Sequence, residues 1–303
     1  MKNDKLVIIL GSTGMLGYAV TKYFVENTNF DLIYTTRDIE GDALLRKRVD
    51  FVKFAQFPRS ITWERFNIVT NEWLLEGMLG DFTQLFRDRD VYLINCIGLI
   101  KPYCDNTLNA IYTNSQFSHV LSNVCSKRKI KLLQIATDCV YSGNSGQYTE
   151  ENTHDATDVY GRTKSLGESS LAMNIRTSII GEELKGFHSL LEWTKKQTEC
   201  VNGFVNHYWN GLTTKEFAKI CNQIINENLY EAGTFHIHSR SKTLFADEIT
   251  KEYLVSLIKE KYDLKIKINK YETLEKCDRS LRTSKSLMKN LKINSIEEQI
   301  NEL

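Results

Sequence analysis

Several features are scarce in this 303-residue sequence, and each scarcity argues against a class of protein. No charge of one sign predominates, because 39 Lys and Arg stand against 38 Asp and Glu. This balance removes the usual electrostatic basis for binding nucleic acid or an anionic membrane surface. The cysteines are odd in number, scattered and without a C-x-x-C pair; they are Cys96, Cys104, Cys125, Cys139, Cys200, Cys221 and Cys277. We therefore expect neither a disulfide framework nor a metal site, and a reducing cytoplasm fits best.

Long hydrophobic runs are also missing. The N-terminal stretch MKNDKLVIIL has too short an apolar segment for a signal peptide. No run approaches the ~20 apolar residues that a membrane-spanning helix needs. We therefore expect a cytoplasmic protein without a membrane partner.

The sequence does contain a regular alternation of strand-like and helix-like segments. Short apolar runs predict buried strands, and amphipathic segments between them predict helices; the strands are expected at 5–10, 30–36, 90–98, 131–137 and 174–180. The alternation predicts an α/β fold, with a parallel sheet covered by helices on both faces. We expect this domain over residues 1–180, with later strands contributed from about 200–240, and a smaller lobe over 181–303.

A glycine-rich turn follows the first expected strand. GSTGMLG places Gly11, Gly14 and Gly17 in a G-x-x-G-x-x-G pattern before an amphipathic helix. Glycine lets the backbone approach a pyrophosphate closely, and the helix N-terminus offers unpaired N–H groups to its oxygens. In this context the turn predicts a Rossmann-type dinucleotide site, although an ordinary glycine-rich turn stays the alternative. The contacting residues would be Gly11, Ser12, Thr13, Gly14, Met15, Leu16 and Gly17.

The end of the second expected strand, YTTRD, is where such folds read the ribose of the adenosine. An acidic residue there suits a 2′-hydroxyl, and an arginine suits a 2′-phosphate. Arg37 precedes Asp38, so we favour NADP(H), with NAD(H) as the alternative. A surface arginine paired with Asp38 is the competing interpretation of Arg37.

A tyrosine and a lysine lie four residues apart in DVYGRTKSLGE, at Tyr160 and Lys164. On a helix this spacing puts both side chains on one face, roughly 5–6 Å apart at Cβ. The pair is compatible with an ordinary amphipathic surface. It is equally compatible with an acid whose pKa an ammonium lowers.

These motifs together resemble the extended short-chain dehydrogenase/reductase family, and within it the dTDP-4-dehydrorhamnose reductase branch. The resemblance rests on the glycine turn, INCIG, QIATDCVYSGNSGQYTE, DVYGRTKSLGE, IRTS and NGLTT, with a weaker similarity at DRSL. It implies that Tyr160 protonates a carbonyl oxygen, that Thr137 hydrogen-bonds the same oxygen, and that Lys164 lowers the pKa of Tyr160 and holds the nicotinamide ribose. Further coenzyme contacts would be Asn95, Cys96, Ile97, Gly98 and Asn114, with Cys96 interpreted as packing.

The resemblance also implies a nucleotide-diphosphate sugar as substrate, bound by the 181–303 lobe. Arg279 is the leading diphosphate ligand, because arginine can engage phosphate oxygens bidentately. Other expected substrate contacts are Lys101, Asp138, Val140, His188 and Gln197. Asp138 could equally cap a loop, and Trp193, between the last two, is interpreted as core.

The implied reaction is NADPH-dependent reduction of the C4 ketone of a 4-keto-6-deoxyhexose. We favour UDP-2-acetamido-2,6-dideoxy-L-hexos-4-ulose, giving for example UDP-N-acetyl-L-rhamnosamine in surface polysaccharide synthesis, and next dTDP- or UDP-4-keto-L-rhamnose. Related dehydratases place an Asp-Glu pair after the catalytic threonine, whereas Asp138 and Cys139 follow Thr137 here. The alternatives are an epimerase, or a non-catalytic NADP-binding partner that resembles the methionine adenosyltransferase regulatory subunit. The oligomeric state is left open, with a homodimer as one option.

Overall fold

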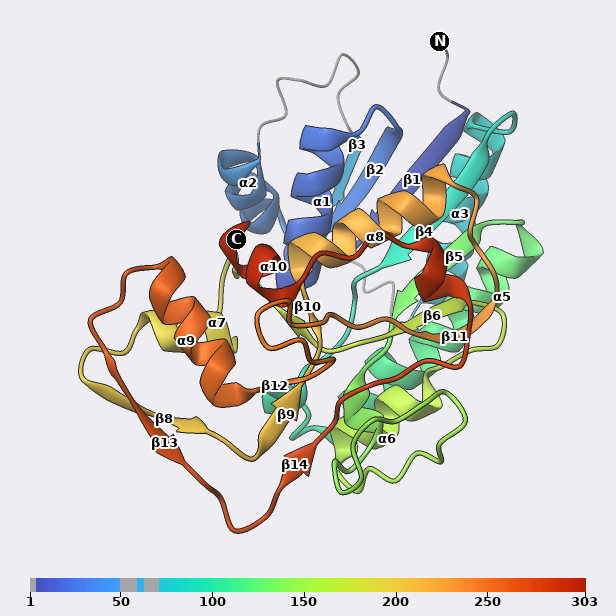
Figure 1. Cartoon of the computed structure of the whole chain (residues 1–303). Helices are drawn as coiled ribbons and strands as arrows, with labels where there is room; N and C mark the ends of the chain where they lie inside the picture. The colour runs from blue at the N-terminus through green and yellow to red at the C-terminus, as the bar shows by residue number, and fades with distance from the viewer. Residues whose placement is uncertain (1–3, 50–58, 63–70) are drawn as a thin grey trace.

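The computed structural model describes residues 4–49, 59–62 and 71–303 (Figure 1). The strands are β1 (Lys5–Leu10), β2 (Asp31–Thr36), β3 (Arg59–Thr62), β4 (Asp90–Asn95), β5 (Lys131–Ile135), β6 (Met173–Arg176), β7 (Ile179–Ile180), β8 (Cys200–Phe204), β9 (His207–Trp209), β10 (Leu212–Thr213), β11 (Gly233–His236), β12 (Ile249–Thr250), β13 (Lys267–Tyr271) and β14 (Cys277–Asp278). The α-helices are α1 (Met15–Asn27), α2 (Ile39–Arg48), α3 (Glu72–Leu85), α4 (Thr107–Ala110), α5 (Phe117–Lys127), α6 (Val159–Leu166), α7 (Leu190–Lys195), α8 (Thr214–Asn226), α9 (Lys251–Lys261) and α10 (Ile296–Asn301).

Seven of the described strands form one parallel sheet in the order β11-β6-β5-β4-β1-β2-β3. The central strand β1 pairs with β2 and β4, with Val7 opposite Leu32 on one side and Tyr92 on the other. This order places the reversal of strand sequence between β1 and β4, the position at which doubly wound sheets bind ligands. The predicted Rossmann-type sheet is confirmed.

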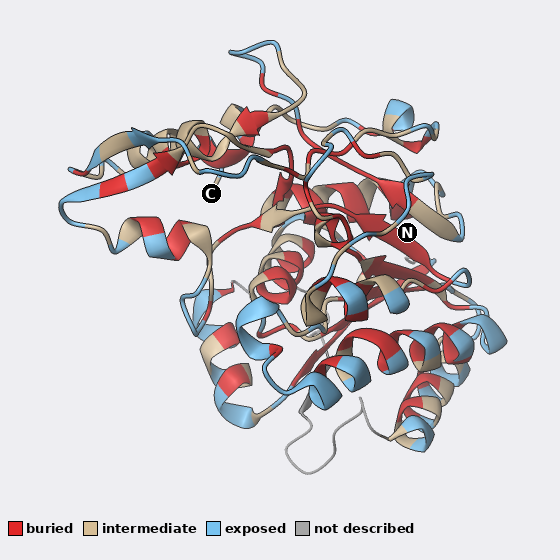
Figure 2. Cartoon of the chain, turned by 90° about the horizontal axis from the view of Figure 1, so that it is seen from below, coloured by how far each residue is buried: buried red, intermediate tan, exposed pale blue. Residues whose placement is uncertain are grey.

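The core forms two layers because successive side chains of a strand point to opposite faces. From β1, Val7 and Ile9 pack with helices α1 and α8 on one face. Leu6, Ile8 and Leu10 pack with α3 and α5 on the other. Figure 2 shows the buried strands between helices whose outer surfaces are exposed. The uninterrupted apolar run of β1 is therefore explained by burial on both faces.

A second, smaller group of elements follows β6 in the chain. Helices α7, α9 and α10 share a core with strands β9 and β12, and Trp209, Leu254 and Ile258 belong to it. Short sheets β12-β9-β14, β13-β8 and β10-β7 complete this group. Between β10 and β12 the chain returns to the large sheet through α8, which packs on α1, and through the edge strand β11. The domain boundary at residue 180 stays a prediction.

Two local departures from the sequence-based expectation matter for the site. The strand expected over 174–180 is split, because β6 ends at Arg176 and β7 pairs with β10 in a separate sheet. The helical segment expected between the strands at 90–98 and 131–137 contains a π-helical stretch, η3 (Ile111–Gln116), between α4 and α5. Such wide turns are rare and occur often at functional sites.

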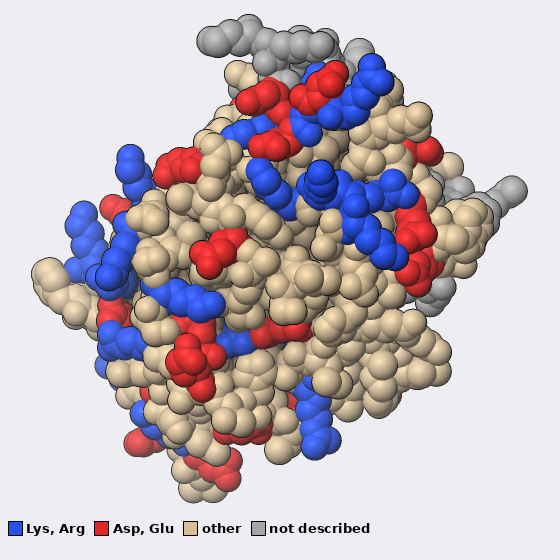
Figure 3. Space-filling model, turned by 90° about the vertical axis from the view of Figure 1, so that its right-hand side faces the viewer, with Lys and Arg blue, Asp and Glu red and all other residues tan. Residues whose placement is uncertain are grey.

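The surface carries both signs of charge. Figure 3 shows Lys and Arg side chains beside Asp and Glu side chains on the same face. Among the described helices, none is both long and apolar enough to cross a membrane.

Candidate active site

The glycine turn after β1 is shaped by its backbone. Gly11 has φ of 80°, a left-handed conformation that favours glycine. A Cβ on Gly17 would lie 2.0 Å from the carbonyl oxygen of Gly11, so no side chain fits there. Gly14 caps α1 without a side-chain hydrogen bond, and the Ser12 hydroxyl is buried without a partner among the described residues. The backbone of this turn can approach a dinucleotide pyrophosphate closely. The uncapped start of α1 and the Ser12 hydroxyl are also suited to bind the pyrophosphate oxygens.

The end of β2 lies beside this turn. Thr35 accepts a hydrogen bond from the Gly11 N–H at its hydroxyl (3.1 Å) and one from the Ser12 N–H at its carbonyl (2.9 Å). Asp38 caps α2 by accepting from the Gly41 N–H (2.5 Å), and its other oxygen lies 3.7 Å from Lys185 Nζ. Arg37 is exposed and forms no ion pair with Asp38 in the described part of the chain. The Asp38 carboxylate thus caps helix α2, whereas the Arg37 guanidinium is available to bind a ligand.

The end of β4 forms the opposite wall of the turn. A Cβ on Gly11 would lie 2.9 Å from the Ile97 side chain. Asn95 fixes this segment, because its amide donates to Gln134 (3.3 Å) and its oxygen accepts from the Ile97 N–H (3.0 Å). Burial raises the pKa of the Cys96 thiol far above its usual range, which agrees with a packing role. Contacts of 95–98 with a coenzyme stay a prediction.

Asn114 lies in the π-helical stretch and ties three segments together. Its oxygen accepts from the Leu99 N–H (2.8 Å), and its amide donates to the Leu99 carbonyl (3.1 Å) and to the Thr163 hydroxyl (3.3 Å). A Cβ on Gly98 would lie 3.5 Å from the Asn114 oxygen and 3.9 Å from Lys164 Nζ. Asn114 therefore braces the end of β4 against helix α6. Its predicted contact with a coenzyme is not tested by this geometry.

Helix α6 begins where Asp158 accepts a hydrogen bond from the Gly161 N–H (3.0 Å). A Cβ on Gly161 would lie 2.4 Å from the Cys139 carbonyl oxygen, so glycine lets α6 pack closely on the 3-10 turn η4 (Asp138–Val140). This packing brings Tyr160 toward Thr137, whose buried hydroxyl donates to the Asp138 carboxylate (3.2 Å) and accepts from the Cys139 N–H (3.2 Å). Tyr160 and Thr137 thus lie near each other beyond the end of β5, and their catalytic roles stay a prediction.

Lys164 points into the same space. Its side chain is 8% exposed, and Nζ donates to the Ile135 carbonyl at the end of β5 (2.8 Å). Burial lowers the pKa of Lys164 to about 8, with the Glu168 carboxylate acting in the opposite direction. A buried lysine with a strongly lowered pKa is typical of functional sites.

The structure corrects one electrostatic expectation. We expected Lys164 to lower the pKa of Tyr160, but burial raises the pKa of Tyr160 above its usual value, and Cys139 adds to that effect. The Thr137 hydroxyl acts in the lowering direction. Loss of water around the phenol outweighs the effect of the Thr137 hydroxyl, and the Asp138 carboxylate adds to the rise. Burial therefore favours the protonated form of Tyr160, which is the form that can donate a proton.

Asp138 extends the site away from the glycine turn. It is buried, and burial raises the pKa of its carboxyl, while the charges of Lys251 and Arg279 act to lower it. Arg279 is held by a hydrogen bond from Nε to the Tyr141 carbonyl (2.9 Å). Lys251, at the start of α9, lies over the Trp209 ring (5.2 Å from Nζ to the centroid) and was not predicted. Only the fold brings Lys251 here, because its local sequence carries no motif.

The remaining predicted substrate contacts lie in less specific surroundings. Lys101 forms an exposed ion pair with Asp158 (3.2 Å) at the start of α6. His188 makes an edge contact with Tyr103 (5.5 Å between centroids), and the Gln197 amide donates to the Trp193 carbonyl in its own helix turn (2.9 Å). One nearby expectation is wrong, since Trp193 was interpreted as core and is 42% exposed.

Val140, the last predicted substrate contact, is fully buried in a small cluster with Tyr141, Tyr148 and Leu281. It also lines a cavity with residues of α6 and of the 154–156 loop. No group of three or more His, Cys, Asp or Glu is placed to hold a metal ion within the described ranges.

Comparison with known families gives two matches over most of the chain. The profile described as "RmlD substrate binding domain" matches residues 104–301, and that of the "NAD dependent epimerase/dehydratase family" matches residues 7–178. The two together cover both the glycine turn and the Arg279 segment.

Solved structures of similar fold include enzymes of sugar-nucleotide metabolism. A dTDP-4-dehydrorhamnose reductase from Bacillus anthracis, in complex with NADP, is 18% identical with a TM-score of 0.70, covering 98% of this chain and 97% of that one. WbmG from Bordetella bronchiseptica, in complex with NAD and UDP, is 16% identical with a TM-score of 0.72, covering 97% and 91%. A UDP-N-acetylglucosamine 4-epimerase from Methanobrevibacter ruminantium is 15% identical with a TM-score of 0.74, covering 99% and 97%. At these identities the likeness establishes the fold.

Curated relatives include methionine adenosyltransferase 2 subunit beta from Rattus norvegicus, which is 23% identical over 251 residues. The match covers 77% of this chain and 66% of the relative. The chain thus spans slightly less than two thirds of that protein.

Proposed function

This chain belongs to the RmlD substrate-binding-domain family of extended short-chain dehydrogenases/reductases, and on that premise we propose that it is a sugar-nucleotide 4-ketoreductase. The reaction would be NADPH-dependent reduction of the C4 ketone of a nucleotide-linked 4-keto-6-deoxyhexose. The observation that supports the proposal is the position of Tyr160 near Thr137, with Lys164 four residues further along α6 and its Nζ on the Ile135 carbonyl. Each of the three has a use in carbonyl reduction.

The nicotinamide, when bound, supplies the hydride. As the carbonyl carbon receives it, negative charge develops on the oxygen, and donors placed there stabilise that charge. Tyr160, with its proton tightly held, donates that proton to the oxygen, while the Thr137 hydroxyl orients the carbonyl by a hydrogen bond. Lys164, whose pKa burial lowers to about 8, would hold the nicotinamide ribose.

We favour NADP(H) over NAD(H). Asp38, the residue that would bind a 2′-hydroxyl, has one oxygen on the Gly41 N–H and the other near Lys185. Arg37 is exposed at the strand end where a 2′-phosphate would lie. One structural relative was solved with NADP and another with NAD, so this fold can accommodate either coenzyme.

The favoured substrate is UDP-2-acetamido-2,6-dideoxy-L-hexos-4-ulose, with dTDP- or UDP-4-keto-L-rhamnose next. Arg279 would bind the diphosphate, and the buried Asp138 would accept a hydrogen bond from the sugar. A pocket that hydrogen-bonds the acetamido group should discriminate against a 2-hydroxyl, because its buried partners would be left unpaired. A cytoplasmic role in surface polysaccharide synthesis follows from this substrate class.

The second candidate is a partner subunit without catalysis, which the 23% identical relatives suggest. An intact Thr137, Tyr160 and Lys164 set favours the enzyme. An epimerase or dehydratase is less favoured, because Cys139 occupies the position at which a dehydratase would need a second carboxyl group.

The test is NADPH oxidation by the purified chain with enzymatically generated 4-keto sugar nucleotides, followed by product stereochemistry. We expect the highest kcat/KM with the UDP-2-acetamido-4-keto-L-sugar. An equal or higher kcat/KM with dTDP-4-keto-L-rhamnose would contradict the favoured substrate but not the proposed reductase activity. NADPH binding without NADPH oxidation in the presence of any of these 4-keto sugar nucleotides would instead favour the partner subunit.

A further inference from the structure

The small sheet β12-β9-β14 places two long cationic side chains on either side of its middle strand. Thr250 and Asp278 lie opposite Tyr208 on the two sides of β9. These two residues end their strands, so Lys251 and Arg279 leave the sheet immediately after them. Because β12 is antiparallel to β9 and β14 is parallel to it, the two cations leave at opposite ends of β9.

Lys251 reaches back along β9 to the end at which Arg279 leaves. Its Nζ lies 5.2 Å from the centroid of the Trp209 ring, at the last residue of β9. A Cβ on Gly211 would lie 2.6 Å from Cζ2 of that ring and 2.3 Å from the Ser178 carbonyl oxygen. The ring therefore lies against the segment that follows β6, at the carboxyl ends of the large sheet, where open α/β sheets bind ligands.

A second lysine beside the same strand shows what is unusual about Lys251. Lys276 Nζ lies 4.9 Å from the centroid of the Tyr208 ring, one residue before Trp209. Successive side chains of a strand point to opposite faces, so the two lysines cover opposite faces of β9. Lys276 is exposed and forms an ion pair with Asp278 (3.2 Å), whereas Lys251 is half-buried and forms no ion pair with a described residue. The less exposed ammonium is the one without a carboxylate in contact.

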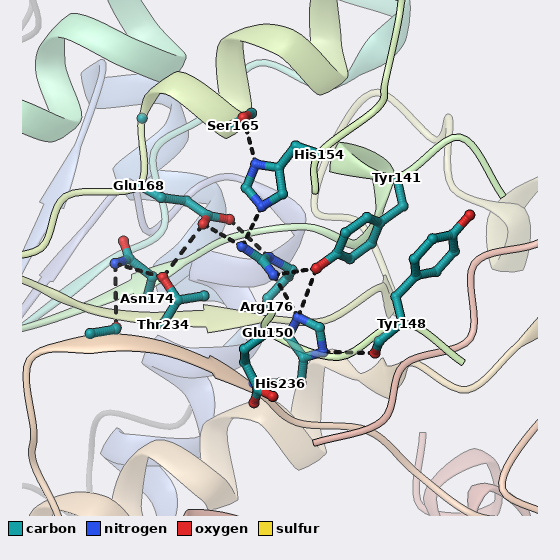
Figure 4. A network of polar contacts seen from close by, with 12 residues as sticks. Tyr141, Tyr148, Glu150, His154, Ser165, Glu168, Asn174, Arg176, Thr234 and His236 are labelled. Atoms are coloured by element: carbon teal, nitrogen blue, oxygen red, sulfur yellow. Dashed lines mark hydrogen bonds and ion pairs between the residues drawn. The ribbon is translucent and has the colours of Figure 1, made fainter. Parts of the chain in front are cut away.

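Arg279 is held at one nitrogen and has unused donors at the other two. Nε donates to the Tyr141 carbonyl (2.9 Å), and neither Nη atom has a partner in the described part of the chain. Tyr141 is fixed by a buried network, shown in Figure 4, in which its hydroxyl contacts Arg176 Nη1 (2.6 Å). Arg176 also contacts His236 Nε2 (2.6 Å) and forms a bidentate pair with Glu168 (3.0 and 2.5 Å). The Arg279 guanidinium is thus anchored to a rigid segment with donors left for a ligand.

Positive charge exceeds negative charge around these two side chains. Asp138 acts on both Lys251 and Arg279, but burial raises the pKa of its carboxyl. Asp158 also acts on Arg279, but it already forms an ion pair with Lys101 (3.2 Å). Desolvated positive charge without a counter-ion costs free energy, and an anionic ligand would offset that cost.

Building on the proposed function, we propose that Lys251 is a second cation for the diphosphate of the nucleotide-sugar substrate, held over Trp209 so that it faces the phosphate oxygens that Arg279 engages. The diphosphate of such a substrate carries two negative charges, which matches the two cations. Arginine supplies a planar fork of donors, and lysine supplies a compact charge with rotatable donors. Lys251 lies in no motif of the sequence, so its role follows from strand register and from the Trp209 contact.

The test is the binding of UDP and of dTDP to the full chain by isothermal titration calorimetry, with NADP+ at saturation so that the coenzyme site is occupied. In Lys251→Gln the Kd of the tighter nucleotide should rise by about 10- to 100-fold, because a charge-assisted contact to phosphate is lost. Lys251→Arg keeps the charge and should raise the Kd much less. The matched control is Lys276→Gln, which removes an ammonium from the opposite face of β9 and should leave the Kd unchanged.

An unchanged Kd in Lys251→Gln, an equal rise in Lys276→Gln, or no binding of either nucleotide by the wild type would overturn the proposal. If Lys251→Gln does not fold, Lys251→Met replaces it, because its apolar side chain still covers the Trp209 ring. Nucleotide binding needs no turnover, so its outcome is separate from that of the reductase assay. A chain that binds UDP through Lys251 but oxidises no NADPH would contradict the reductase and keep this site. A reductase whose Kd for both nucleotides is unchanged in Lys251→Gln would do the reverse.

Discussion

The coenzyme end and the catalytic end of this site are built in opposite ways. At the coenzyme end, the turn after β1 takes its shape from the backbone, with Gly17 where no Cβ fits and a main-chain hydrogen bond from Ser12 to Thr35 at the end of β2. The catalytic end depends on side chains from β5, α6, β6 and β11 that come from distant parts of the chain. The conformation of the coenzyme end is therefore encoded by residues close together in the sequence. The catalytic end, in contrast, forms only once the sheet has assembled.

The two ends should therefore fail differently. A change at the coenzyme end should act through steric exclusion or through one surface contact. A change at the catalytic end should act on proton transfer, or spread through the network around Arg176. Three substitutions separate these behaviours.

The largest effect is expected at the catalytic end. Tyr160→Phe keeps the ring and its packing but removes the proton that the mechanism delivers to the carbonyl. Reductase kcat should fall by about 10²- to 10⁴-fold, with NADPH affinity largely retained, as measured by steady-state kinetics and fluorescence titration. A variant with more than about a tenth of wild-type kcat would remove Tyr160 from the role of acid.

An intermediate effect is expected for the exposed arginine at the coenzyme end. Arg37→Ala should weaken NADPH far more than NADH, because a charge-assisted bond to the 2′-phosphate is lost only with the phosphorylated coenzyme. Such bonds contribute about 1.5–3 kcal/mol, or roughly 10- to 150-fold in affinity. Equal weakening of both coenzymes in binding titrations would show that Arg37 is only surface, and NAD(H) would then be the favoured coenzyme.

The smallest effect in energy is expected for the glycine turn. Gly17→Ala places a methyl against the Gly11 carbonyl, and such overpacking costs typically about 1–3 kcal/mol. Thermal or urea unfolding should show this loss together with weaker binding of both coenzymes. The matched control is Gly77→Ala on α3, where a Cβ would meet no atom within 4 Å.

That control should be neutral or stabilising by up to about 1 kcal/mol, because alanine favours helix more than glycine does. Equal unfolding midpoints for the two variants would contradict the steric account of the turn.

Much of the fold was predictable from the sequence because burial on both faces of a parallel sheet leaves continuous apolar runs. The run over Lys5–Leu10 and the glycines after it fixed the first strand, the turn and helix α1. The common helical face of Tyr160 and Lys164 was predictable from their spacing, whereas their proposed roles came from the family resemblance.

The predictions that were wrong or missing concern properties that depend on the three-dimensional surroundings of a residue. The direction of the Tyr160 pKa shift follows from how much water the fold excludes, which spacing does not report. Trp193 was wrongly placed in the core because an aromatic residue at helical spacing does not show which face is covered. Lys251 and the contacts of Arg176 join segments distant in sequence, and only the completed sheet brings them together.

The position of β11 has a consequence for synthesis and folding. This edge strand pairs with β6 but emerges from the ribosome only after the whole of β7–β10 and α8. The first strand is tied to the same late region, because Lys5 Nζ donates to the Ile225 carbonyl of α8 (2.6 Å). Until then a nascent chain carries β6 as an open edge with unpaired N–H and C=O groups, a template for aggregation. A fragment cut at residue 180 would keep that edge permanently, so the full chain is the smallest unit we expect to express well.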